Sequence, residues 1–221
     1  GKDRRGVFFA EGDVTGATVR FQQDWPAVTQ LGGHLRFVND GFQLDPSTGA
    51  LAGVPLHDVA AGIAVYGHSP VEVSAQAQAD AAAVLALMRQ SPFRAAHADT
   101  LDALEVSGPA QVAVAVSVPH HASARIDGTV VLDGVAMRES RFDLAFDHVR
   151  GPVAFDQTGF HADALAAQQD GQAGRLALRA GPGHVRQPTH AFEGELDMAM
   201  DADMLLARAP DLGWLRPHVR G

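Results

Sequence analysis

The sequence contains no cysteine among its 221 residues. Disulfide bridges, thiolate zinc sites and a cysteine nucleophile are therefore excluded, although the absence does not identify the compartment. Aromatic residues are also few, at 6% of the chain, and 11 of them are Phe. So small a supply of flat side chains argues against a stacking platform for nucleic acid or sugar.

Positive charge is scarce as well. The chain has 17 Lys and Arg against 26 Asp and Glu, which gives a formal net charge of −9. A protein that tracks nucleic acid phosphates needs a basic stripe, and no such stripe is present. We therefore expect no nucleic-acid partner.

Long apolar runs are missing. No run approaches the ~20 residues that span a bilayer. The charged residues 1–5 are not followed by the apolar segment of a signal peptide. The chain does not begin with Met, and it stops at residues 219–221, where the pattern predicts the start of a strand. Either a targeting segment has been removed or the chain is a fragment of a longer protein, and the end at 219–221 favours the fragment.

Hydrophobic residues make up 46% of the chain, enough for a packed core. One stretch, residues 78–91, has the composition of a helix, with a run of alanines followed by leucines and a methionine. Asp80 is expected in its first turn and Arg89 in its last, where each charge suits the helix dipole. The following Pro92 ends it, because a residue before proline is displaced from the α region.

The end of this helix is echoed near the C-terminus. Residues 87–92 (LMRQSP) resemble residues 205–210 (LLARAP), and a Val-x-Gly sequence follows each copy, at 106–108 and 219–221. Such self-similarity suggests a repeat. The hypothesis divides the chain into residues 1–108, the end of one repeat with its helix at 78–91, and residues 109–221, the next repeat with the start of a helix at 202–209.

Elsewhere the chain alternates with period two, as half-buried strands do. Tight turns are predicted at residues 39–41 (NDG) and 45–49 (DPSTG), and a short helical turn at 99–105. The predicted strands cover residues 14–22, 34–37, 42–44, 59–66, 70–77, 111–118, 125–133, 142–147, 153–155, a strand from 160, 175–179 and 192–200. This pattern predicts an antiparallel meander with one apolar and one polar face.

The predicted apolar face is larger than one short helix can cover. It comprises Leu35, Phe37, Phe42, Leu44, Val112, Val114, Val116, Ile126, Val130, Leu132, Phe142, Leu144, Phe146, Val153, Phe155, Phe160, Leu176, Leu178, Phe192, Leu196, Met198 and Met200. Exposed apolar patches of this size are rare without a purpose. The sheet could close into a barrel, pack on a second sheet, or form an open trough that holds an apolar ligand. Pattern alone favours a core, whereas the excess of apolar strand over helix favours the trough.

Eleven histidines raise the question of a metal site. His120 and His121 would point to opposite faces of a strand and could not chelate together. His184 and His190 flank Pro188 without a carboxylate at metal-ligand spacing, and no HExxH-type pattern occurs. We expect solvated loop histidines and no metal.

The remaining polar motifs also have simpler interpretations than catalysis. His68-Ser69 and Asp147-His148 lack the GxSxG elbow of a hydrolase, and the second pair is interpreted as the end of a polar strand face. Residues 181–183 (GPG) resemble a phosphate loop only weakly, because no helix follows them. The alternating acidic residues are interpreted as a solvated face: Asp143, Asp147, Glu193, Glu195 and Asp197.

The order of several short motifs resembles the AsmA-like proteins, specifically the YhdP group. These motifs are Asp24-Trp25-Pro26, Leu31-Gly32-Gly33-His34-Leu35-Arg36-Phe37, Gly49-Ala50-Leu51-Ala52-Gly53, Ser91-Pro92 after the helix, Val106-x-Gly108, Val118-Pro119, Gly128-x-Val130, Gly151-x-Val153-x-Phe155 and Gly159-x-His161. The likeness runs across nearly the whole chain. It implies large envelope proteins of Gram-negative bacteria, anchored in the inner membrane by an N-terminal helix, whose repeating β-groove is thought to carry phospholipids across the periplasm to the outer membrane. No catalytic residues belong to this family.

We therefore expect a long, twisted, curled antiparallel sheet with one short capping helix per repeat. The resemblance implies a non-catalytic, periplasmic conduit whose partners are phospholipid acyl chains and neighbouring repeats of the same longer chain. It needs no cofactor, and it contacts membranes only through parts outside this sequence. The alternative is a closed β-sandwich that serves as a scaffold or adhesion module of the cell envelope.

Overall fold

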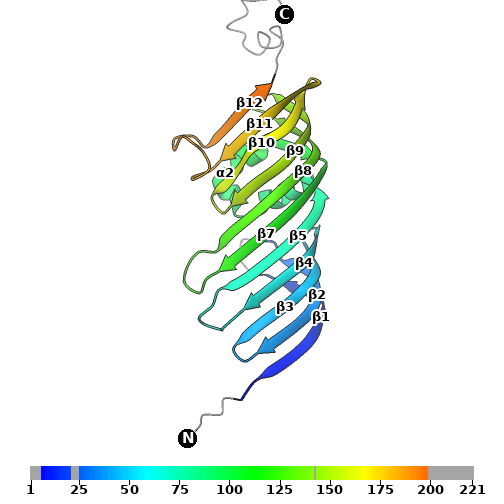
Figure 1. The fold of residues 1–221 in the computed structure, drawn as a ribbon, viewed down its shortest axis with the longest axis vertical. Coiled ribbons are helices and arrows are strands. Elements are labelled where there is room, and N and C mark those ends of the chain that lie inside the picture. The colour runs from blue at the N-terminus through cyan, green and yellow to red at the C-terminus, as the bar shows by residue number, and fades with distance from the viewer. Residues whose placement is uncertain (1–5, 21–24, 142, 199–221) are drawn as a thin grey trace, which may run out of the picture.

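The computed structural model describes residues 6–20, 25–141 and 143–198. Its strands form one antiparallel sheet in the order β1-β2-β3-β4-β5-β7-β8-β9-β10-β11-β12, with β6 beside β8 beyond the end of β7 (Figure 1). The strands are β1 Phe9–Val19, β2 Val28–Val38, β3 Gly41–Leu51, β4 Val54–Ile63, β5 Val71–Asp80, β6 Leu104–Ser107, β7 Pro109–Val118, β8 Arg125–Glu139, β9 Leu144–Asp156, β10 Gly159–Gln169, β11 Gln172–Ala180 and β12 Phe192–Met198.

The mainly β, antiparallel architecture is as predicted, and the sheet is long and open. Among the described strands, β1 and β12 end the sheet without pairing with each other, and no second sheet is present. A closed barrel and a two-sheet sandwich are therefore both excluded for this part of the chain. We expected a curled sheet; the observed sheet is open and not strongly curled, and helices rather than sheet closure cover the middle of its apolar face.

Two helices, not one, connect β5 to β6. They are α1 (Ala81–Arg89) and α2 (Phe93–Ala103). The predicted helix began three residues too early, because residues 78–80 extend β5 and pair with residues 109–111 of β7. Asp80 is the N-cap rather than a first-turn residue, and its Oδ1 accepts a hydrogen bond from the N–H of Ala82 (2.8 Å). The helical turn predicted at 99–105 covers only the second half of α2, because Leu104 already belongs to β6.

The turn predicted at residues 45–49 is wrong. Strand β3 continues through these residues. Its pairing with β4 shifts register between Leu44 and Ser47. The chain reverses instead at Ala52 and Gly53, which both have positive φ (49° and 84°). Two consecutive residues with positive φ are the signature of a type I′ hairpin.

Strands β8 and β9 are longer than predicted because each contains a bulge. Gly134 (φ 78°) and His148 (φ 53°) mark these irregularities. After each bulge the inward-facing residues change parity, so that Val135 follows Leu132, and Val149 follows Phe146. Both new positions are completely buried. This change interrupts the period-two pattern, which is why β9 was predicted as two separate strands.

The apolar face is continuous across the sheet. Residues directly opposite each other on neighbouring strands share a face. One row across six strands is Leu35, Leu44, Ala61, Val73, Val116 and Ile126. A second row is Ala77, Val112, Val130 and Val153. The apolar face therefore extends from β2 to β9, although the pairing shifts register within β2–β3, β3–β4, β4–β5 and β8–β9.

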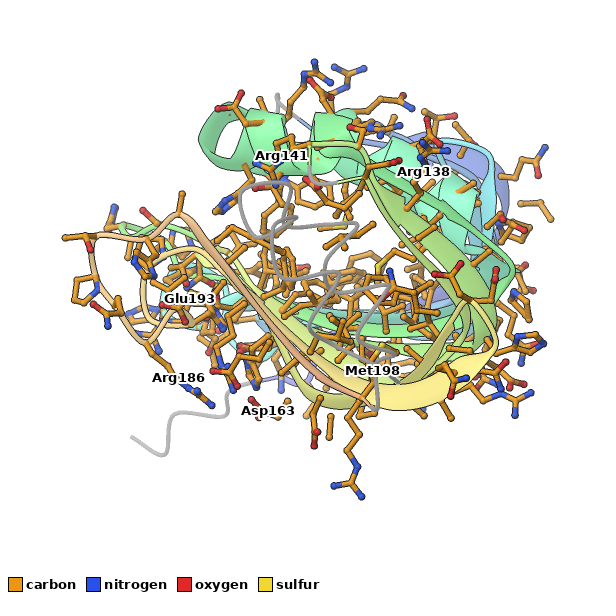
Figure 2. All side chains as sticks on the ribbon, turned by 90° about the horizontal axis from the view of Figure 1, so that it is seen from above. Arg138, Arg141, Asp163, Arg186, Glu193 and Met198 are labelled. Carbon is orange, nitrogen blue, oxygen red and sulfur yellow. The ribbon has the colours of Figure 1, made fainter. Side chains whose placement is uncertain are left out.

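Both helices lie over this face (Figure 2). Ala81 packs with the larger apolar cluster, whose other buried residues lie on β7 to β11. Leu85, Phe93 and Leu101 pack with Ile126 in a second cluster. Neither helix in the described part of the chain is long and apolar enough to cross a membrane.

Candidate functional site

The predicted apolar-face residues are mostly half-buried rather than sealed in a core. Leu44, Ile126, Phe146 and Leu176 are buried, with 3–7% of their surface exposed. The others that the structure describes are intermediate: Leu35, Phe37, Phe42, Val112, Val114, Val116, Val130, Leu132, Leu144, Val153, Phe155, Phe160, Leu178, Phe192, Leu196 and Met198. Phe142 and Met200 lie outside the described residues.

The structure brings more than half of these residues together in two clusters. The larger contains Phe146, Leu176, Val130, Leu132, Leu144, Val153, Leu178 and Leu196. The second, under the helices, contains Ile126, Val114, Val116 and Phe155. Leu35, Phe37, Phe42, Leu44, Val112, Phe160, Phe192 and Met198 belong to neither cluster.

Residues outside the two clusters still occupy the same face. Leu35 opposes Leu44, and Phe37 opposes Phe42 with ring centroids 5.8 Å apart. Phe160 lies opposite Phe155 in the register of β10 and β9. The apolar surface therefore reaches beyond the part that the helices cover.

An aromatic contact beneath α2 was missed by the sequence reasoning. Phe93, 7% exposed, meets Phe155 edge to face at 6.4 Å between centroids and Trp25 edge to face at 6.0 Å. The residues come from α2, from β9 and from the connection between β1 and β2. Their separations in sequence are too large for any periodicity to reveal the contact. A large apolar residue directly after Pro92 was the only local signal.

The inward-facing series of apolar residues in β8 ends with a charged residue. Glu139 is 5% exposed and follows Val135 and Met137 in the inward series. Its carboxylate pairs with the guanidinium of Arg141, which also lies 5.7 Å from the ring centroid of Phe192. Figure 2 shows Arg141 on the same side of the sheet as the helices, and Asp163 and Arg186 on the outer side.

A hydrogen-bonded chain on the polar side was also missed. His161 Nδ1 lies 3.0 Å from His184 Nδ1, and His184 Nε2 lies 3.1 Å from Asp156 Oδ1. Burial alone would raise the pKa of Asp156, but the hydrogen bonds from Thr158 and His184 prevail and lower that pKa to about 2. This chain fastens the loop at 181–191 to the turn between β9 and β10. His184 is thus not a solvated loop residue, contrary to expectation.

Two further interpretations of polar motifs are corrected. His120 and His121 lie in a turn rather than a strand, with ring centroids 5.8 Å apart, so the opposite-face argument does not apply to them. Asp147 and His148 lie within β9, at its bulge, rather than at a strand end. Residues 181–183 do form a turn after β11. No group of three or more metal-ligating side chains converges among the described residues.

The fold and the apolar face define a class of protein: an extended antiparallel sheet with one continuous apolar side, crossed by a short pair of helices. Residues 1–211 match the family described as YhdP protein. The match covers almost the whole chain, which therefore belongs to the YhdP family.

One curated relative is the intermembrane phospholipid transporter YhdP of Escherichia coli (strain K12). It is 24% identical over 167 residues, which are 75% of this chain and 13% of that protein. The chain thus corresponds to a small part of this relative's length. No solved structure matches it.

Proposed function

We propose that the chain is a non-catalytic segment of a hydrophobic groove that conducts phospholipids between the inner and outer membranes. The observation that carries this proposal is the pair of apolar rows, made of buried and half-buried residues that lie opposite each other on neighbouring strands, which together cross the sheet from β2 to β9. The name of the E. coli relative, an intermembrane phospholipid transporter, supplies the ligand class.

The chemistry of this face suits acyl chains. Burial of a CH₂ group is worth ~0.8 kcal/mol, and it is non-directional. An acyl chain can therefore slide from one row of side chains to the next without breaking oriented hydrogen bonds. Such a surface offers binding and passage rather than chemistry, so we propose no enzymatic activity.

The repeated organisation of the groove is part of the proposal and rests on the similarity between residues 87–92 and 205–210. Strands β5 and β7 pair along ten consecutive positions, so α1, α2 and β6 form an insertion between strands that are neighbours in the sheet. We propose that residues 1–108 end one groove repeat and residues 109–221 form the next, in a periplasmic part of an inner-membrane-anchored protein. The second predicted helix, at 202–209, lies outside the described residues.

The alternative, a closed β-sandwich used as a scaffold or adhesion module, has no structural support in the described residues, because all their strands belong to one sheet. The two functions also predict different contents of the purified protein. A groove segment should retain phospholipid or detergent through purification, and native mass spectrometry followed by lipid extraction would detect it. A uniformly lipid-free mass, unchanged after incubation with phospholipid vesicles, would reject the conduit.

A further inference from the structure

Helix α2 ties together the two ends of β9. At one end, the N–H of Ser140 donates to the carbonyl of Ala103 at the end of α2 (2.9 Å). At the other end, Nε2 of His97 lies 3.0 Å from the carbonyl oxygen of Thr158. Strand β9 contains two residues with positive φ, His148 and Gly151. Helix α2 bridges the ends of this strand on the side of the sheet that carries the apolar face (Figure 2).

The space beneath α2 is filled by side chains. Phe93 is 7% exposed and contacts Phe155 and Trp25, while Leu101 (3%) and Leu85 (8%) pack in the same cluster with Ile126. Packed protein interiors have the density of organic crystals and leave no room for a further chain of CH₂ groups. With α2 seated, an acyl chain therefore cannot lie against β7–β9 at this level.

The attachments of the helices are unequal. Their ends are firmly held. The N–H of Ala81 donates to the carbonyl of Gly108 (2.7 Å), and the N–H of Gly108 donates to Oδ2 of Asp80 (3.0 Å). Strand β6 also pairs with β8 over four positions.

The first half of α2 is attached less firmly to the sheet. Pro92 provides no side-chain cap, and His97 has non-helical dihedral angles (φ −133°, ψ 24°). Hydrogen bonds from the Phe93 N–H to Ser91 Oγ (3.3 Å) and from Arg94 to Asp102 (3.0 and 2.8 Å) stay within the helical segment and can move with it. A segment with few hydrogen bonds to its neighbours opens locally at low free-energy cost.

We propose that Phe93 determines the passage of acyl chains along the apolar face. Seated against Phe155 and Trp25, it closes the path under α2; withdrawn, with the His97–Thr158 hydrogen bond broken, it opens the path while both ends of the helical segment stay anchored. This inference rests on the proposed phospholipid conduit, and it names the residue that regulates it.

The absence of cysteine makes a direct test practicable. The double variant His97→Cys, Thr158→Cys would be locked with a short, cleavable thiol crosslinker. A photoreactive benzoylphenylalanine would replace Phe155, under α2, or Phe37, on β2 outside the helix-covered cluster. After incubation with phosphatidylethanolamine–phosphatidylglycerol vesicles and illumination, lipid adducts would be measured by mass spectrometry.

In the unlocked protein, adducts should form at both positions. Locking should reduce the adduct at 155 about tenfold, equivalent to about 1.4 kcal/mol. It should leave the adduct at 37 unchanged, and cleavage of the crosslinker should restore the adduct at 155. As a matched control, a crosslink between Glu72→Cys and Ser117→Cys joins opposed residues of β5 and β7 on the polar face and should change neither adduct.

The outcomes separate the two proposals. A lipid adduct at position 155 that locking does not reduce would overturn the role proposed for Phe93. The same conclusion would follow if the unlocked protein formed a lipid adduct at position 37 but none at position 155. No adduct at either position, locked or unlocked, would instead reject the conduit. In that case, amide hydrogen exchange decides whether α2 opens. The amides of α2 should exchange faster than those of β6, and the crosslink should slow their exchange. Equal exchange rates in α2 and β6, with no effect of the crosslink, would show that α2 does not open.

Discussion

Leu196 of β12 lies directly opposite Leu176 of β11, and the two residues differ in burial: Leu176 is 3% exposed, whereas Leu196 is only partly buried. An unpaired charge in an apolar environment costs several kcal/mol unless it reaches water or becomes protonated. The two positions should therefore respond differently to the same substitution.

We predict that Leu196→Asp or Met198→Asp removes bound lipid with little change in melting temperature, because both side chains are near water when the face is empty. Leu176→Asp should unfold the protein. Asp197→Ala, which changes the outward residue between the two, should affect neither property. Melting temperature and bound lipid per protein, measured on all four variants, test this. Full lipid binding by the Leu196 and Met198 variants would show that this part of the face does not contact lipid.

The packing of Phe155 on Gly128 provides a second prediction. The two residues are opposed in β9 and β8, and a Cβ built on Gly128 would lie 2.1 Å from Phe155 Cζ. Gly128→Ala should therefore displace the ring and disturb its contact with Phe93, at a cost of about 1–3 kcal/mol in the free energy of unfolding. Gly12→Ala on β1, where no atom lies within 4 Å of the new Cβ, is the matched control. Urea denaturation measures both, and equal stabilities would refute the packing argument.

Period-two alternation was sufficient to predict the face carried by β7. The predicted inward valines, Val112, Val114 and Val116, are all half-buried, and the alanines at 113 and 115 are exposed between them. This strand has no bulge, so parity alone decides which side chains face inward. In β8 and β9 the same rule fails after Gly134 and His148, because one extra residue in a strand reverses the parity of those that follow.

Helix propensity alone predicted the wrong helix boundaries for a different reason. Residues 78–80 suit a helix, but they form the last three of the ten residue pairs that join β5 to β7, and this pairing holds them in β5. Helix α2, in contrast, mixes polar and apolar residues without a clear stripe, and its position depends on tertiary contacts such as Phe93 with Phe155. Contacts between residues distant in sequence, including the His161–His184–Asp156 chain, are set by the three-dimensional arrangement and leave no periodic signal.

The network around Asp156 predicts an acid-sensitive stability. Its carboxylate accepts hydrogen bonds from the N–H and hydroxyl of Thr158 (2.6 Å each) and from His184 (3.1 Å), which hold its pKa at about 2 instead of 3.8. Because the folded-state pKa is depressed, this contribution is complete above about pH 4 and is lost as the pH falls toward 2. It amounts to at most about 2 kcal/mol.

Asp156→Asn should lower stability at neutral pH and flatten the pH dependence between pH 4 and 2, as measured by urea denaturation across this range. Asp127→Asn, on the residue directly opposite in β8, removes a neighbouring carboxylate without removing these hydrogen bonds and should preserve the acid dependence. An unchanged acid limb in the Asp156 variant would show that the network does not stabilise the fold.

The last prediction concerns the edge strand β1. Among the described strands it pairs only with β2, and the residues at its start are strongly exposed: Val7 at 77%, Phe8 at 59% and Phe9 at 57%. Unpaired strand edges bearing apolar side chains are templates for association, and natural proteins protect them with lysine. We therefore expect the 221-residue chain to self-associate with increasing concentration.

Phe9→Lys should raise the dissociation constant of this self-association about tenfold or more, a change of about 1.4 kcal/mol. Val65→Lys, at an exposed apolar residue in the turn after β4, should leave it unchanged. Sedimentation equilibrium over a wide concentration range measures all three proteins. A wild-type chain that stays monomeric throughout would show that its edge is protected, and equal effects of the two lysines would assign the association to net charge rather than to the edge of β1.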